Sequence, residues 1–220
     1  MTDERPAVAL REEEPRFDRL LEYAIALLLG VGAILIAWSS YQSALWGGES
    51  LTQYTQAIRS SDAASQAWNE AFQTDVQDQN LFLQYATAVA TGQQELGDYV
   101  LQTLMRPELV EAIGWWAEQP EGAQPSSPFV DENPSWTNEA LERAVGLDEQ
   151  AEGEFLAGSE ANSKGDAFTL VTVFMAVALF LLGVAAVLKG RLVRVALVVG
   201  AAAVLGYSTI QLLGLGIYPG

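Results

Sequence analysis

The 22-residue stretch Ala167–Leu188, AFTLVTVFMAVALFLLGVAAVL, contains no charged residue. An α-helix rises about 1.5 Å per residue, so roughly 20 residues cross the ~30 Å hydrocarbon core of a bilayer. A second uncharged stretch, Val195–Leu213, has 19 residues, and a third, Leu20–Trp38, has one charge, Glu22, near its start. The sequence therefore predicts three transmembrane helices, over residues 20–38, 167–188 and 195–213.

Basic residues beside these segments predict their orientation in the cell membrane. They precede the first segment and fill the link between the second and third: Arg11, Arg16, Arg19, Lys189, Arg191 and Arg194. Cytoplasmic flanks carry the excess of Lys and Arg. We therefore expect a cytoplasmic N-terminal arm, residues 1–19, and a cytoplasmic loop, residues 189–194. Residues 39–166 and the tail 214–220 are then expected outside the cytoplasm.

The charge of the chain is concentrated in the segment between the first two predicted spans. The chain carries a formal net charge of −17. Residues 39–166 hold 21 Asp and Glu against four Lys and Arg, so this segment accounts for that charge. Such a surface repels nucleic acid and anionic lipid headgroups. We therefore expect an acidic extracytoplasmic domain with no nucleic-acid partner.

The chain has no cysteine and no histidine. This composition excludes disulfides, thiolate ligands, a thiol nucleophile and the commonest general base. Carboxylates gather at several positions that could in principle bind calcium or act as a hydrolytic pair: Asp75 with Asp78, Asp131 with Glu132, Asp148 with Glu149, and Glu152 with Glu154. They lack EF-hand spacing, and we interpret them as a solvated acidic face. We expect no enzyme activity, no metal and no cofactor.

The segment between the spans shows helical spacing and no strand pattern. A helix is predicted from Ser39 to about Thr91, with the polar stretch Gln73–Asn80 as either a turn or an exposed part of it. Pro107 opens a short helix to Glu118, and four prolines mark residues 119–134 as a loop. Ser135 or Thr137 can cap a last helix that continues into the second span at Ala167.

Two arrangements of these helices fit the chain length, a tall antiparallel pair and a shorter four-helix bundle. We favour the bundle, because four helices bury a core more readily than two. The predicted fold class is thus all-α, a membrane protein with three transmembrane helices and a helical-bundle ectodomain whose helices continue from the spans. Small residues on the spans predict close helix packing, chiefly within one chain: Ala26, Gly30, Ala176, Gly183, Gly190, Ala196, Gly200 and Ala203.

Two groups of aromatic residues are candidate sites. Trp38, Tyr41 and Trp46, with Lys164, are expected at the outer membrane interface, where such side chains anchor. They could contact lipid headgroups, or simply anchor a segment that packs tightly at Gly47-Gly48. The second group lies in and around the proline-rich loop: Trp115, Trp116, Phe129 and Trp136. These side chains either fill one end of the helical domain or form an interaction surface.

Three motifs resemble a family of bacterial three-span membrane proteins of unknown function. They are AWSSYQSALWGGE at 37–49, RPEL at 106–109 with Ala112 and Trp115 followed by Pro125, Ser127, Pro128 and Phe129, and GDAF at 165–168 leading into VTV at 171–173 and ALF at 178–180. The resemblance covers about residues 20–213. It implies the three-span topology and brings no activity, substrate or catalytic residue.

The sequence therefore predicts a non-enzymatic integral membrane protein. We expect its helical ectodomain to act in assembly, scaffolding or contact with another envelope component, with membrane lipid and either copies of itself or a membrane-complex protein as partners. The alternative is a sensor-like extracytoplasmic ligand-binding module that signals through a separate partner. The spans carry no charged residue beyond Glu22, near the start of the first, and this disfavours a channel or transporter.

Overall fold

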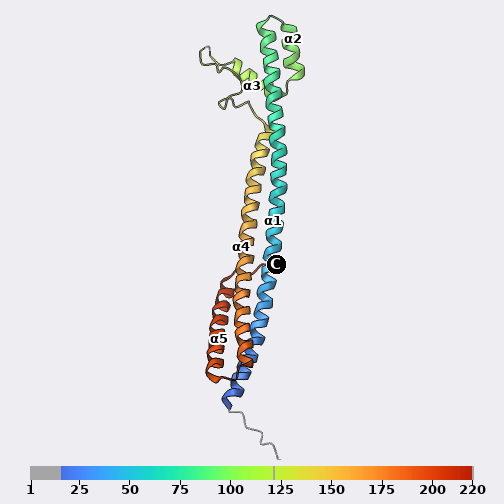
Figure 1. The fold of residues 1–220 in the computed structure, drawn as a ribbon. Coiled ribbons are helices and arrows are strands. Elements are labelled where there is room, and N and C mark those ends of the chain that lie inside the picture. Colours follow the sequence, from blue (N-terminus) through green and yellow to red (C-terminus); the bar gives the residue numbers. More distant parts are fainter. Residues whose placement is uncertain (1–15, 121, 220) are drawn as a thin grey trace, which may run out of the picture. The chain divides into compact units, whose positions relative to one another are not determined.

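The computed structural model describes residues 16–120 and 122–219, which form helices, turns and loops with no strand among them. The helices are α1 (Arg16–Ala90), α2 (Gln94–Tyr99), the π-helix η1 (Val100–Leu104), α3 (Pro107–Ala117), α4 (Glu139–Val187) and α5 (Arg191–Gly214), shown in Figure 1. Three of them, α1, α4 and α5, are long and apolar enough to cross a membrane. The protein is an all-α membrane protein, as the sequence predicts.

The chain divides into two compact units. The first unit comprises the residues up to Thr52 and from Ala157 onward, and the second comprises Gln53–Leu156. Helices α1 and α4 contribute residues to both. Both helices therefore continue past the ends of their apolar runs, because no proline or positive-φ residue interrupts them.

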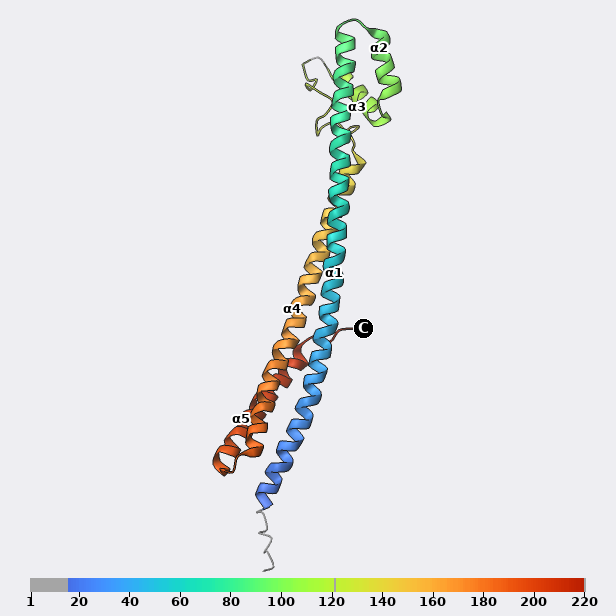
Figure 2. The same ribbon diagram turned by 45° about the vertical axis from the view of Figure 1, so that its right-hand side comes forward.

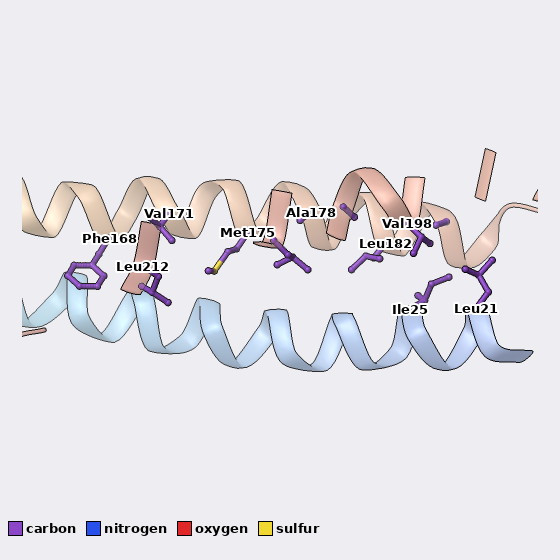
Figure 3. Packing of buried hydrophobic residues seen from close by; sticks show 12 residues of the cluster. Leu21, Ile25, Phe168, Val171, Met175, Ala178, Leu182, Val198 and Leu212 are labelled. Carbon is purple, nitrogen blue, oxygen red and sulfur yellow. The ribbon is translucent and has the colours of Figure 1, made fainter. Parts of the chain in front are cut away.

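In the first unit, α1, α4 and α5 pack around one apolar core. Figure 3 shows Leu21 and Ile25 of α1 turned toward Leu182 of α4 and Val198 of α5. The other buried members of this core come mainly from α4 and α5: Phe168, Val171, Met175, Ala178, Ala185, Ala201, Leu205 and Leu212. Large apolar side chains also cover the outer faces; Leu213, for example, is 80% exposed. In lipid such outer side chains remain in an apolar medium, so close packing must hold the helices together.

The strips of small residues lie mostly outside this core, and our expectation that they pack within the chain is largely wrong. Ala26, Gly30, Ala176, Gly183 and Ala203 are all exposed. Helix α4 turns Met175, Ala178, Leu182 and Ala185 inward at spacings of three and four residues. Since successive helix positions differ by about 100°, residues 176 and 183 point away from that face.

The connection between α4 and α5 is shorter than the predicted loop at 189–194. Helix α4 ends at Val187, and α5 begins at Arg191 with Gly190 as its N-cap residue. The Arg194 backbone N–H donates to the Gly190 carbonyl at 2.9 Å, which closes the first turn of α5. The guanidinium of Arg194 lies 3.5 Å from the Glu22 carboxylate of α1. The start of α1 and the α4–α5 connection therefore lie at the same end of the first unit.

In the second unit, α1 and α4 form an antiparallel pair with small side chains between them. The buried residues of α1 in this pair recur at spacings of three and four positions: Ala57, Ser60, Ala64, Ala67 and Ala71. Ala140 and Ala144 of α4 are buried too. The direction follows from the cross-links: the Ser60 hydroxyl donates to Glu154 at 2.8 Å, and the Trp68 indole N–H donates to Asp148 at 2.7 Å. Small side chains allow the two backbones to approach closely.

The four-helix bundle that we favoured is wrong, because α1 continues through Gln73–Asn80 without a turn. Helix α1 ends instead at a turn where Gly92 has a φ of 76°, a conformation that favours glycine. Beyond it α2, η1 and α3 fold back beside the end of α1 (Figures 1 and 2). Their buried residues pack against Leu81, Phe82 and Tyr85 of α1: Val100, Met105, Leu109 and Ile113.

The last helix begins later than the sequence suggests. Asn138, rather than Ser135 or Thr137, caps α4, because its side-chain oxygen accepts from the backbone N–H groups of Ala140 and Leu141 at 3.2 and 3.3 Å. The Asn138 amide also donates to the Ala71 carbonyl of α1 at 3.0 Å. One buried side chain therefore fixes both the start of α4 and its position along α1.

Candidate functional site

The segment from Trp38 to Glu49 forms a polar seam with α4 in the first unit. The buried Ser39 hydroxyl donates to the Phe168 carbonyl at 2.9 Å. One turn later, the Ser43 hydroxyl donates to the Gly165 carbonyl at 3.0 Å and lies 2.8 Å from the Thr169 hydroxyl. Residues four apart share a helix face, so these two serines hold α1 against α4.

Close packing in this seam places Gly165 of α4 against the α1 backbone at Ser43 and Gly47, whereas the Cα positions of Gly47 and Gly48, where we expected tight packing, face open space. A Cβ atom at position 165 would lie 3.4 Å from the Ser43 carbonyl oxygen and 3.6 Å from the Gly47 nitrogen. A Cβ at Gly47 or Gly48 would meet nothing within 4 Å. A Cβ at position 165 would thus be in van der Waals contact with the α1 backbone, so a larger side chain there would collide with α1.

The same segment of α1 holds the residues that follow α5. We call Gln42, Trp46 and Glu49 the tail seat, since they occupy one face of α1 and each contacts this tail. The buried Gln42 side-chain oxygen accepts from the Tyr218 backbone N–H at 2.9 Å. The Trp46 indole N–H donates to the Gly216 carbonyl at 3.2 Å. The Trp46 and Tyr218 rings meet edge to face, with centroids 5.2 Å apart.

Two charged contacts complete the tail seat. The Tyr218 hydroxyl donates to the Glu49 carboxylate at 3.0 Å, and this hydrogen bond, followed by the negative charge of Glu49, raises the pKa of Tyr218. On the other helix, the Lys164 ammonium lies 4.4 Å from the centre of the Trp46 ring. Lys164 also pairs with Glu160 at 2.8 Å, and this hydrogen bond lowers the pKa of Glu160.

The four predicted membrane-interface residues thus divide into two pairs. Trp38 and Tyr41 are 44% and 57% exposed, with ring centroids 6.3 Å apart, and present their rings outward. Trp46 and Lys164 are partly buried: Trp46 belongs to the tail seat, and the Lys164 ammonium lies over its ring. The sequence contains the aromatic motif, but nothing in it pairs position 46 with position 218, because 170 residues or so of chain separate them.

The second candidate group lies in the second unit, where the structure joins three of its four members. Phe129 packs edge to face against Phe82 of α1 at 5.5 Å and against Trp136 at 4.8 Å. Trp116 also meets Phe82 at 5.5 Å, and its indole N–H donates to the Pro125 carbonyl at 2.7 Å. Trp115 is half-buried. These contacts agree with the interpretation that the aromatic side chains fill one end of the helical domain.

Arg106 organises the loop beside this aromatic group, a role the sequence analysis missed. Its Nε donates to the buried carboxylate of Asp78 at 2.8 Å, and its other nitrogens reach Glu108 at 3.2 Å and the Thr137 carbonyl at 2.8 Å. The guanidinium also lies 5.4 Å from the centre of the Trp136 ring. Burial raises the pKa of Asp78, and Arg106 opposes that rise.

Several carboxylates that we interpreted as a solvated face have structural partners. Asp78 is buried against Arg106, and Asp148 and Glu154 accept hydrogen bonds from Trp68 and Ser60 of α1. Over residues 16–120 and 122–219, no three acidic side chains converge on a position that could hold a metal ion. Asp148 and Glu154 instead connect α4 to α1, and Asp78 holds Arg106.

Comparison of the chain with protein-family models, with curated proteins and with solved structures finds no match. The resemblance to three-span bacterial membrane proteins therefore stays a prediction. The hydrogen bonds, ring contacts and ion pairs described above position helices, loops and the tail.

Proposed function

We propose that this protein is a non-enzymatic membrane protein that assembles through its second unit, held outside the cytoplasm, with a second copy of the chain or another envelope component. The observation that carries the proposal is the distribution of apolar residues in α1 and α4. The seam between the two helices is built from Ala and Ser, while larger apolar side chains face outward. Exposed apolar surface on a water-soluble domain commonly marks an interface.

The outward residues follow a helix-pairing pattern. On α1, Ile58, Phe72, Val76 and Leu83 are 63%, 69%, 40% and 64% exposed. Their spacings of 14, 4 and 7 positions match one seam of a heptad repeat, the arrangement that receives another helix. Polar residues interrupt this outward row of apolar side chains, so we expect the contact with a partner helix to be moderate and reversible and not permanent. A second copy is the simplest partner, because a two-fold pair uses the same face twice.

A groove beside this face strengthens the case. It has a volume of about 560 Å³ and lies between α1 and α4 of the second unit. Its walls are mainly apolar: Tyr54, Ala57, Ile58, Ser61, Asp62, Ala151 and Phe155. Tyr54 and Phe155 meet across it with ring centroids 5.3 Å apart. A large side chain from a partner helix would fill this groove.

The proposed orientation keeps the N-terminus and the α4–α5 connection in the cytoplasm. Arg194 pairs with Glu22, so Lys189, Arg191 and Arg194 lie at the same end of the first unit as Arg16 and Arg19. A single end rich in basic residues is what the positive-inside rule expects of a cytoplasmic face. The tail seat is at the opposite end of the apolar segments, and this supports an extracytoplasmic location for residues 39–166 and 214–220.

The test is the native mass of the full chain after gentle extraction from its own membrane. We expect several chains, or one chain with a different protein. Ile58→Glu combined with Phe155→Glu should reduce the mass to a single chain, because two charges would enter the apolar groove. Gln66→Glu, an exposed change on the same helix, should leave the mass unchanged. A wild-type protein that runs alone and captures nothing would contradict the proposal.

A sensor-like function is the second candidate, and the same groove favours it, since about 560 Å³ is within the range of small-molecule sites. The predicted cytoplasmic parts, residues 1–19 and 189–194, are short, so any signal would need a separate partner. A small apolar ligand that raises the thermal midpoint of a single-chain species, and loses this effect in Ile58→Glu, would support this function over assembly.

A further inference from the structure

A pocket of about 160 Å³ lies between α4 and α5, wholly within the first unit. Three polar side chains line it from α5: Tyr207, Ser208 and Gln211. The other lining residues are apolar: Ala167, Leu170, Val171, Phe174 and Leu215. Two direct neighbours of lining residues contact the segment of α1 that holds the tail seat: the Phe168 carbonyl accepts from Ser39, and the Gly216 carbonyl accepts from Trp46. The lining residues therefore lie in the same half of the first unit as the tail seat. The pocket is therefore near one end of the apolar helices and not at their middle.

Ser208 is the feature of this pocket that needs explanation. Its side chain is fully buried, and its hydroxyl oxygen has no hydrogen-bond partner in the described part of the chain. Neighbouring hydroxyls on the same helices are satisfied by their own backbone: Thr209 donates to Leu205 at 2.8 Å, and Thr172 donates to Phe168 at 3.0 Å. A buried hydroxyl without a hydrogen-bond partner costs free energy. A molecule in the pocket that accepts a hydrogen bond from Ser208 would therefore bind more tightly.

A second donor lies beside Ser208. The Gln211 side-chain amide donates to the Tyr207 hydroxyl oxygen at 2.9 Å. A phenol that accepts one hydrogen bond still carries its own proton, so Tyr207 can donate onward. Its ring packs edge to face against Phe174 of α4 at 6.4 Å, which fixes the ring as one wall. The pocket thus combines hydroxyl donors with apolar walls.

We propose that this pocket binds the ester-linked acyl portion of a membrane phospholipid. The ester carbonyl oxygen accepts a hydrogen bond from the Ser208 hydroxyl, with Tyr207 as a second donor in the pocket wall, while the first methylenes of the chain contact Leu170, Phe174 and Leu215. A water molecule occupies about 30 Å³ in the liquid, so the pocket holds an ester group and a few methylenes. The remainder of the lipid lies outside it. The inference needs the protein to be in a membrane and does not depend on how the second unit assembles.

The chemistry of the ester carbonyl gives a direct test. The full chain is reconstituted in nanodiscs of a diester phospholipid or of the diether phospholipid with the same headgroup and chain lengths, and retained lipids per chain are counted by native mass spectrometry. Wild-type protein should retain the diester lipid about threefold to tenfold more than the diether, the range expected for one net hydrogen bond. Ser208→Ala should reduce that preference to near unity.

Two further variants separate this site from general lipid contact. Thr209→Ala removes the adjacent hydroxyl, which is satisfied by Leu205, and should keep the wild-type preference. Ala167→Leu narrows the pocket and should lower retention of both lipids. Equal retention of diester and diether lipid by the wild-type protein, as a water-filled pocket would give, overturns the proposal. So does a Ser208→Ala variant that keeps the preference. The readout is lipid per chain, so it is independent of the number of chains in an assembly.

Discussion

The Tyr218 hydroxyl donates a 3.0 Å hydrogen bond to the Glu49 carboxylate, joining residues 169 positions apart in the chain. Glu49 lies on α1 beyond its apolar run, and Tyr218 follows the end of α5. With Gln42 and Trp46, this contact closes the first unit at the end opposite to the Arg194–Glu22 pair. The tail is therefore a structural part of the three-helix unit.

The first prediction concerns the ionisation of Tyr218. Its pKa is raised by the hydrogen bond to Glu49 and then by the charge of Glu49, so the folded state holds the phenol proton more tightly than the unfolded state does. The stabilisation by this contact should be complete below the ordinary tyrosine pKa and should be lost as the pH rises through the folded value. In Glu49→Gln, Tyr218 should ionise at lower pH than in the wild type.

The measurement is ultraviolet titration of tyrosinate in the full chain, with Tyr218→Phe subtracted to isolate residue 218. Tyr41→Phe, which removes an exposed hydroxyl on the same helix, serves as the control and should leave the difference curve unchanged. Identical titration of Tyr218 in the wild type and in Glu49→Gln would show that the contact is absent in solution.

The second prediction concerns the buried pair of Asp78 and Arg106. Arg106→Met leaves a buried carboxylate without its partner and should destabilise the second unit by about 3–5 kcal/mol. Asp78→Asn should cost clearly less, because it removes the charge that burial penalises, and Arg106 keeps Glu108 and the Thr137 carbonyl as partners. Urea unfolding of the full chain in detergent, followed by tryptophan fluorescence, gives both values.

The pH dependence of this pair has a definite sign. Burial raises the pKa of Asp78 above its unfolded value, and removal of Arg106 should raise it further. Since the folded state then binds a proton more tightly than the unfolded state, stability should increase as the pH falls through the folded pKa toward the ordinary aspartate value. The deficit of Arg106→Met should therefore shrink in acid. A deficit that grows as the pH falls would contradict this account.

The third prediction separates the two roles of Asn138. Asn138→Ala removes both the cap of α4 and the hydrogen bond to Ala71, and should cost about 1–2 kcal/mol. Asn138→Asp keeps a capping oxygen but loses the amide donor to Ala71, so its cost should be intermediate. Thr137→Ala, at an exposed neighbouring position, should change the unfolding free energy by less than about 0.5 kcal/mol. Equal costs for the Ala and Asp variants would show that capping is not the main role.

The fourth prediction compares glycines of α4. Gly146→Ala and Gly153→Ala place a Cβ in open space, so each should raise stability by about 0.5–1 kcal/mol through helix propensity. Gly165→Leu places a large side chain against Ser43 and Trp46 of α1 and should destabilise by about 1–3 kcal/mol through overpacking. Thermal midpoints measured by circular dichroism in one detergent test the order. A Gly165→Leu variant as stable as the wild type would show that the close approach of α1 and α4 is not tight.

Much of the fold could be predicted from local sequence signals. Three apolar stretches predict the long helices, because a helix needs about 20 consecutive apolar residues to cross a bilayer. Pro107 marks the start of α3, since proline is tolerated at the first turn of a helix. The absence of breakers explains why α4 extends from Glu139 through the apolar run to Val187. The aromatic groups around Trp46 and Phe129 are also visible in the sequence.

The sequence by itself determined the helical class, the three membrane-length helices and the residue types available for contact, because hydrophobic run length and helix breakers are local properties. The tertiary structure alone decided which residues meet. It paired Tyr218 with Glu49 and placed Arg106 on Asp78 and Asn138 on Ala71. It also buried the Ser208 hydroxyl where no other described residue forms a hydrogen bond with it. These relationships depend on the rotation and register of helices packed against one another, and a difference of one residue turns a side chain by about 100°. No local pattern contains that information.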